Sequence, residues 1–112
     1  FVGSVVAYDG DVKRSLLGVP DGPVVGEVAV TAMAANVCGV LGADVSVAVT
    51  GVAGPGPQGG EEPGTVWMAT CVDGVVEVVH TRWQFDRTRI RQFTVITVLD
   101  ALRLRLLARR DA

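Results

Sequence analysis

Residues 45–50 have the sequence VSVAVT, which predicts a strand. Valine alternates there with small side chains, a pattern typical of a central strand that helices cover closely on its faces. A second valine-rich run at residues 2–8 also predicts a strand, because it is short and ends at the turn signal Asp9-Gly10. Two predicted helices separate these strands, and a helical crossover favours parallel pairing between them.

The two helices between these strands begin and end at recognisable residues. Asp11 can cap a short helix through residue 17, since Gly18 suits the left-handed position after a helix. Apolar residues at helical spacing predict a second helix from residue 23 or 26 to residue 41, and Gly42 ends it. This second helix is rich in alanine, so we expect it to be well buried.

The last predicted helix is also the longest. Asp86 can cap it, and it runs to about Arg109. Steps of three and four residues give it an apolar stripe made of Ile90, Phe93, Thr97, Ala101, Leu104 and Ala108. Arginines at positions 103, 105, 109 and 110 gather near its C-terminus, where cations stabilise the helix dipole, so we expect them to be solvated.

The remaining strands form a hairpin. Residues 65–72 and 75–85 each read as a strand, and Asp73-Gly74 between them is a strong signal for a two-residue turn. The sequence therefore predicts one α/β domain over residues 1–112, with a mixed sheet of about four strands and helices packed on it.

The composition excludes several classes of protein. Ten Lys or Arg residues against twelve Asp or Glu residues give a net charge of −2. The chain therefore lacks the excess of positive charge that is typical of nucleic-acid-binding proteins. No apolar run approaches the roughly 18 residues that a membrane-spanning helix needs, and no secretory signal is visible. We therefore expect a soluble, cytoplasmic protein with no nucleic-acid or membrane partner.

The two cysteines and the single histidine lack metal-ligand spacing. Cys38 and Cys71 lie in apolar contexts, so we expect reduced core thiols, with a disulfide between them as the alternative. His80 is expected to be a structural residue of its strand. No metal or other cofactor is predicted.

Residues 51–64 are the most informative segment for function, with six glycines and three prolines. The segment follows the carboxyl end of a buried strand, the usual ligand edge of open α/β sheets, and Thr50 would place a hydroxyl at that rim. Gly51 and Gly54 would let backbone amides approach a ligand closely. The spacing matches neither the dinucleotide fingerprint nor the phosphate-binding loop, and a flexible connector is the alternative to a ligand loop.

Lys13 is the only lysine, and Tyr8 precedes it at the end of the first predicted strand. Lys13 can be a partly desolvated amine that acts as a base or phosphate contact, or an exposed helix charge. Arginines at 87, 89 and 91 crowd the start of the last helix, where positive charge opposes the helix dipole. That misfit leaves open an anionic partner such as phosphate.

Five blocks, in order, carry a family resemblance. They are VVAY at 5–8 with Lys13, LLGVP at 16–20, GAD at 42–44, TGVAGP at 50–55 and GTV at 64–66. Together they resemble the CinA C-terminal domain, the nicotinamide-nucleotide amidohydrolase family, through nearly the whole chain. TGVAGP is the most specific block, and residues 87–91 followed by an amphipathic helix are similar to the family's ending.

The resemblance implies hydrolysis of the carboxamide of nicotinamide mononucleotide to nicotinate mononucleotide and ammonia, in pyridine-nucleotide recycling and without a metal. Such a serine amidohydrolase uses a serine hydroxyl as nucleophile and a lysine as base, and backbone amides stabilise the oxyanion. By resemblance the catalytic residues are Lys13 as the base, Tyr8 and Thr50, and the substrate-binding residues are Gly51, Gly54, Arg87 and Arg91. One of the two arginines would hold the phosphate, and the assembly would be a homodimer.

The sequence departs from the family's pattern at the nucleophile. The family has an acidic-Ser-Cys-Thr-Gly-Gly segment upstream of the first strand, and this sequence contains none. Ser4, Ser15 and Ser46 lack that motif context, so we expect an N-terminally truncated domain that is inactive by itself. The alternative is a non-catalytic nucleotide-binding or dimerisation module.

Overall fold

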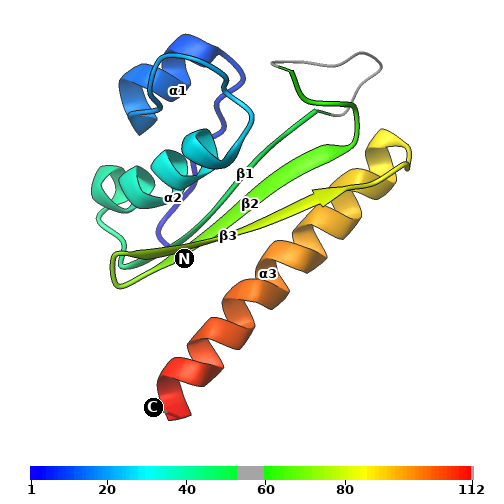
Figure 1. Cartoon of the computed structure of the whole chain (residues 1–112). Helices are drawn as coiled ribbons and strands as arrows, with labels where there is room; N and C mark the ends of the chain where they lie inside the picture. Colours follow the sequence, from blue (N-terminus) through cyan, green and yellow to red (C-terminus); the bar gives the residue numbers. More distant parts are fainter. Residues whose placement is uncertain (53–59, 112) are drawn as a thin grey trace.

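The computed structural model describes residues 1–52 and 60–111, which place helices on both faces of one sheet (Figure 1). The elements are, in chain order, α1 (Gly10–Leu17), α2 (Glu27–Leu41), β1 (Val45–Gly51), β2 (Thr65–Val72), β3 (Val75–Arg82) and α3 (Arg87–Asp111). α1 and α2 lie over one face of the sheet, and α3 crosses the other. The α/β class predicted from the sequence is confirmed.

The sheet is an antiparallel meander in the order β1-β2-β3. Asp73 and Gly74 form the predicted turn between β2 and β3, and their positive φ values of 50° and 82° match a two-residue hairpin turn. In the resulting register Trp67 is opposite both Thr50 of β1 and His80 of β3. The predicted hairpin is therefore confirmed.

Two predictions for the sheet are wrong. Residues 2–8 join no ladder among the described residues, and the sheet has three strands, all antiparallel, rather than a mixed set of about four. The valine pattern of residues 2–8 reflects packing on one side: Val5 and Ala7 rest against the core, while Val6 is 76% exposed. Such alternation reports a buried side of the chain and does not require a neighbouring strand.

β2, and not the stretch at residues 45–50, is the central strand. β1 is an edge strand of the described sheet. Its alternation still has the expected cause, because Ala48 packs toward α2 and Val47 toward α3. β2 has no clean alternation because both of its faces are covered, and every residue except Trp67 is buried.

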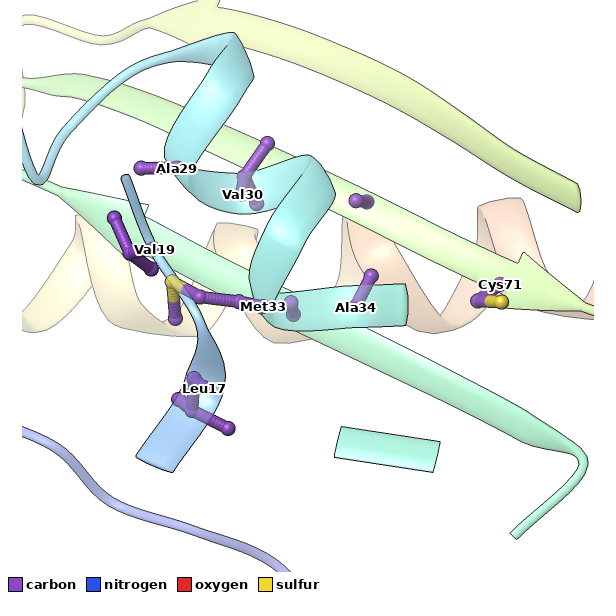
Figure 2. Packing of buried hydrophobic residues seen from close by; sticks show 9 residues of the cluster. Leu17, Val19, Ala29, Val30, Met33, Ala34 and Cys71 are labelled. Carbon is purple, nitrogen blue, oxygen red and sulfur yellow. The ribbon is translucent and has the colours of Figure 1, made fainter. Parts of the chain in front are cut away.

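Two apolar clusters lie on opposite faces of the sheet. The cluster between the sheet and the helices α1 and α2 (Figure 2) contains Leu17, Val19, Ala29, Val30, Met33, Ala34, Ala48, Ala69 and Cys71. The cluster under α3 contains Val66, Met68, Ile90 and Val98. Alanines on both α2 and the sheet mean that this helix can pack close to the strands.

The ends of α1 and α2 follow the predicted chemistry, with one shift. Asp9, and not Asp11, is the N-cap of α1, and its carboxylate accepts a hydrogen bond from the Asp11 N–H at 2.7 Å. Gly18 and Gly42 end the two helices in left-handed conformations, with φ of 64° and 67°.

Asp86 caps α3 as expected, accepting from the Arg89 N–H at 2.8 Å. The face of α3 that packs on the sheet shares only Ile90 with the predicted stripe among its buried residues. The buried residues lie four apart and are Ile90, Thr94 and Val98. Of the predicted stripe, Phe93, Leu104 and Ala108 are exposed. Apolar residues occur almost all round this helix, so their spacing did not single out one face. Even so, no helix in the described part of the chain has the length and apolarity to cross a membrane.

Arg105 extends the packed face of α3, although the sequence predicts a solvated cation. Its Nη1 donates to the Thr70 carbonyl at 2.9 Å and to the Thr70 hydroxyl at 3.0 Å, and its Nε forms an ion pair with Glu77. The side chain is 17% exposed, against 60% for Arg103, which pairs with Asp100 on the same helix. Arg105 thus ties α3 to β2 and β3.

We predict that Arg105→Met lowers the free energy of unfolding by about 1–3 kcal/mol, because it leaves partly buried hydrogen-bonding groups on the sheet without a partner. Arg103→Met, in the same helix, is the matched control and should change it by less than about 0.5 kcal/mol, as expected of an exposed ion pair. Urea unfolding followed by circular dichroism measures both. Equal effects of the two substitutions would contradict the anchoring role.

Candidate functional site

α1 and the end of β1 bring together Lys13 and Thr50, which are 37 residues apart in the sequence. The Lys13 Nζ donates to Thr50 Oγ1 at 3.2 Å, and that hydroxyl donates in turn to the Val24 carbonyl at 2.8 Å. Thr50 is 4% exposed, so the sheet and the segment that leads into α2 fix its position. Because the single hydroxyl proton points to Val24, the lone pairs of the oxygen face the amine.

Lys13 has no ion pair among the residues that the structure describes, whereas the neighbouring Arg14 pairs with Asp11 at 3.4 Å and Asp21 at 3.8 Å. Burial lowers the pKa of the Lys13 amine below its ordinary 10.5, because desolvation disfavours the charged form. An amine with a lowered pKa is neutral in a larger fraction of molecules and can accept a proton. Arg14 is thus paired with exposed carboxylates, whereas Lys13 in the same turn of α1 contacts a hydroxyl.

The two ends of the segment after β1 are held by backbone hydrogen bonds. The Val52 N–H donates to the Thr65 carbonyl at 2.9 Å, and the Gly64 N–H donates to the Val52 carbonyl at 2.6 Å. The Gly64 carbonyl accepts from the Trp83 N–H at 2.9 Å. The rim beside Thr50 is thus fixed to the start of β2 and to the chain after β3.

Gly51 adjoins this rim and has a packing reason to be glycine. A Cβ at this position would lie 3.0 Å from the Thr65 carbonyl oxygen. The close packing against β2 is thus a structural reason for glycine at position 51, in addition to its predicted role in holding a substrate. Gly54, the second predicted substrate glycine, lies outside the described residues.

The other predicted site residues are not part of the Lys13–Thr50 contact. Tyr8 is 97% exposed and precedes α1. Arg87 and Arg91 are exposed in the first turns of α3, the helix that lies on the opposite face of the sheet from α1 (Figure 1). Of the predicted set, the structure brings Lys13 and Thr50 into contact, with Gly51 next to Thr50 in the chain.

Sequence reasoning missed two neighbours of Thr50. Every residue has a backbone carbonyl, so the residue type of Val24 does not indicate that its carbonyl accepts a hydrogen bond from Thr50. Trp67, the cross-strand partner of Thr50, stacks on His80 with ring centroids 4.0 Å apart, and its buried indole Nε1 has no hydrogen-bond partner among the described residues. This pair could have been found, because counting outward from the turn at Asp73-Gly74 places Trp67 opposite His80.

A cavity of about 720 Å³ lies away from this site, between residues 1–5, α2, β1 and the α3 residues Leu99 and Leu102. Its lining includes neither Lys13 nor Thr50, and it is mostly aliphatic. Within the described ranges there is also no group of three His, Cys, Asp or Glu side chains that could hold a metal ion. Lys13 and Thr50 are therefore the best candidates for chemistry.

Comparison with known proteins shows the family to which this chain is similar. The model described as the CinA C-terminal domain matches residues 1–106. Among curated proteins, a CinA-like protein of Frankia casuarinae is 43% identical over 114 residues, which covers 96% of this chain and 26% of that protein. A CinA-like protein of Geobacter metallireducens is 39% identical, over 94% of this chain and 27% of its own length. The chain thus spans about a quarter of the length of these relatives.

Solved structures agree with the sequence comparison. A competence-damaged protein (CinA) superfamily protein from Enterobacter cloacae superposes with a TM-score of 0.85 and 31% identity, covering 91% of this chain and 64% of that one. The competence damage-inducible protein A from Klebsiella pneumoniae gives a TM-score of 0.82 and 30% identity, covering 89% of this chain and 66% of that one.

We predict that Gly64→Ala disrupts the rim beside Thr50 and lowers the free energy of unfolding by about 3 kcal/mol or more. Gly64 has φ of +88°, and a Cβ there would overlap the backbone carbonyl of Trp83. Gly60→Ala is the matched control, since Gly60 has φ of +81° but no atom of the described residues within 4 Å of an added Cβ. It should cost about 1 kcal/mol for the backbone conformation alone. Denaturant unfolding of both variants separates the steric effect from the conformational one.

Proposed function

This chain belongs to the CinA C-terminal domain family, and from that premise we propose that it supplies the base for hydrolysis of the carboxamide of nicotinamide mononucleotide. The products are nicotinate mononucleotide and ammonia. The observation that carries the proposal is the contact between Lys13 Nζ and Thr50 Oγ1 at 3.2 Å, in which a partly buried amine with a lowered pKa has a fixed position.

In the proposed reaction a serine hydroxyl attacks the carboxamide carbon while the neutral Lys13 amine takes its proton, which forms the tetrahedral intermediate. The resulting ammonium gives that proton to the departing nitrogen, so the C–N bond breaks and ammonia leaves. A water molecule, deprotonated by the same amine, then hydrolyses the acyl-serine ester and releases nicotinate mononucleotide. Thr50 orients the amine through its oxygen.

In this proposal the nucleophile is a serine that is not among the three serines of these 112 residues. Ser46 donates its hydroxyl hydrogen bond to the Ala34 carbonyl at 2.6 Å, on the underside of α2. Ser4 and Ser15 are exposed, and the hydrogen bond of the Lys13 amine goes to Thr50 instead. The acidic-Ser-Cys-Thr-Gly-Gly segment typical of the family is the proposed source, and the greater length of the relatives is consistent with it.

The remaining site residues have supporting roles in this proposal. Backbone amides at Gly51 and Gly54 stabilise the oxyanion or hold phosphate oxygens. Arg87 or Arg91 pairs with the nucleotide phosphate, and Tyr8 lines the reacting end once the nucleophile segment is in place. The substrate is a free nucleotide, and the active assembly is a homodimer.

We predict that Lys13→Ala abolishes ammonia release from nicotinamide mononucleotide in a protein that joins this chain to an acidic-Ser-Cys-Thr-Gly-Gly segment from a longer family member. The expected loss in kcat is about 10²–10⁴-fold, as for removal of a general base. Ser15→Ala, in the same helix, is the control and should leave the rate unchanged.

Two outcomes of this experiment would overturn the base assignment. Lys13→Ala with an unchanged rate would assign the proton transfer to another group. A parent protein that binds the nucleotide without releasing ammonia would favour the non-catalytic nucleotide-binding module.

We also predict that kcat/KM of the same protein rises with pH along a limb that lies below 10.5, the ordinary pKa of lysine. The base must be neutral, so activity is lost as the pH falls through the lowered pKa of Lys13. Thr50→Val removes an oxygen that accepts from the ammonium, so the limb should move to still lower pH. Thr88→Val, an exposed change in α3, should leave the limb in place. A pH profile without this limb would contradict the role of Lys13.

A further inference from the structure

The two cysteines of the chain lie on facing elements. Cys38 is in α2 and Cys71 in β2, and both are free thiols in this structure. Ser46 donates to the Ala34 carbonyl at 2.6 Å, which places α2 directly over the sheet at this point. Cys38 follows Ala34 by one helical turn on the same face of α2, and Cys71 is the cross-strand partner of Ser46. The two side chains therefore point into the same interface.

The packing around them is close because the neighbouring side chains are small. Alanines at 34, 48 and 69 line the cluster that contains Cys71, and Cys38 packs against that cluster. Burial raises the pKa of the Cys71 thiol, and the adjacent Cys38 thiol raises it further through charge and a hydrogen bond. The two thiols are thus close enough to influence each other.

The two thiols differ in access to solvent. Cys71 is 2% exposed, whereas Cys38 is partly exposed near the end of α2. An oxidant in solution therefore meets Cys38 first. Cys71 is shielded from it, but Cys38 packs against the cluster that contains Cys71.

We propose that Cys38 and Cys71 form an intramolecular disulfide when the protein meets a hydroperoxide, with Cys38 as the attacked thiol and Cys71 as the resolving one. The Cys38 sulfur attacks the peroxide oxygen, the O–O bond breaks, and a sulfenic acid and one water form. The Cys71 sulfur then displaces the sulfenic hydroxyl, which leaves as a second water with the Cys71 proton. Two thiols and one hydrogen peroxide thus give one disulfide and two waters.

The disulfide would join α2 to the central strand. The loop it closes runs from residue 38 to residue 71 and contains β1 with Thr50. Oxidation would therefore tie β2, whose Trp67 is the cross-strand partner of Thr50, to the helix that follows Val24, the hydrogen-bond acceptor of Thr50. Reduction by a dithiol would restore the two free thiols.

The test treats the reduced full chain with equimolar hydrogen peroxide and then with N-ethylmaleimide, and measures the intact mass and the peptide map. We expect a mass about 2 Da below that of the reduced chain, no maleimide on either cysteine, one peptide pair that links residues 38 and 71, and full reversal by dithiothreitol.

Two variants separate the roles of the thiols. Cys71→Ala removes the resolving thiol, so Cys38 should accumulate sulfenic and sulfinic acid. Cys38→Ser removes the attacked thiol, so Cys71 should remain reduced under the same treatment. A wild-type chain in which Cys38 becomes sulfinic acid while Cys71 stays a thiol would overturn the proposal, and so would oxidation that yields only disulfide-linked pairs of chains.

Discussion

The burial of β2 on both of its faces is the constraint on which the rest of the structure depends. This strand bonds to a neighbour along each edge, so its backbone groups are satisfied, and its side chains need a separate cover above and below. Ala69 and Cys71 are covered from the α2 side, and Val66 and Met68 from the α3 side. Full burial of a side chain such as Val30 on the α2 side or Met68 on the α3 side stabilises the fold by about 1.5–3 kcal/mol, so neither layer is dispensable.

The candidate site is a consequence of this arrangement. The register set at the turn between β2 and β3 continues through β2 to β1, where it places Thr50 on the face that α1 and α2 cover. A slip of one residue would turn Thr50 toward α3 and leave Lys13 without its acceptor. The geometry of one amine therefore depends on pairing set more than twenty residues away in the chain, at a turn made of Asp73 and Gly74.

Predictions from the sequence were most accurate where the structure depends on a few neighbouring residues in the chain. Gly18 and Gly42 end helices because a left-handed residue favours glycine, and Asp73-Gly74 turns the chain because both residues tolerate positive φ. Predictions from the sequence were least accurate where the outcome depends on a contact with a residue far away in the chain. The valines at residues 2–8 predicted a strand, but a strand of a sheet needs a neighbouring strand to which its backbone hydrogen-bonds. Arg105 looked solvated, because nothing local reveals that Thr70 and Glu77 lie within its reach.

The same distinction explains why half of the site was predictable. The single lysine and the Thr-Gly block at residues 50–51 suggested residue types with the right chemistry. Neither carries information on the Val24 carbonyl, which orients the Thr50 hydroxyl.

The free-energy cost of burying Lys13 bears on the proposed function. Because burial lowers the pKa of Lys13, folding is penalised in full below that lowered pKa, and the penalty disappears only as the pH rises toward 10.5. A methionine would fill the same space without this penalty. A reaction that needs a neutral amine, as proposed above for Lys13, would account for a lysine at this position despite that cost.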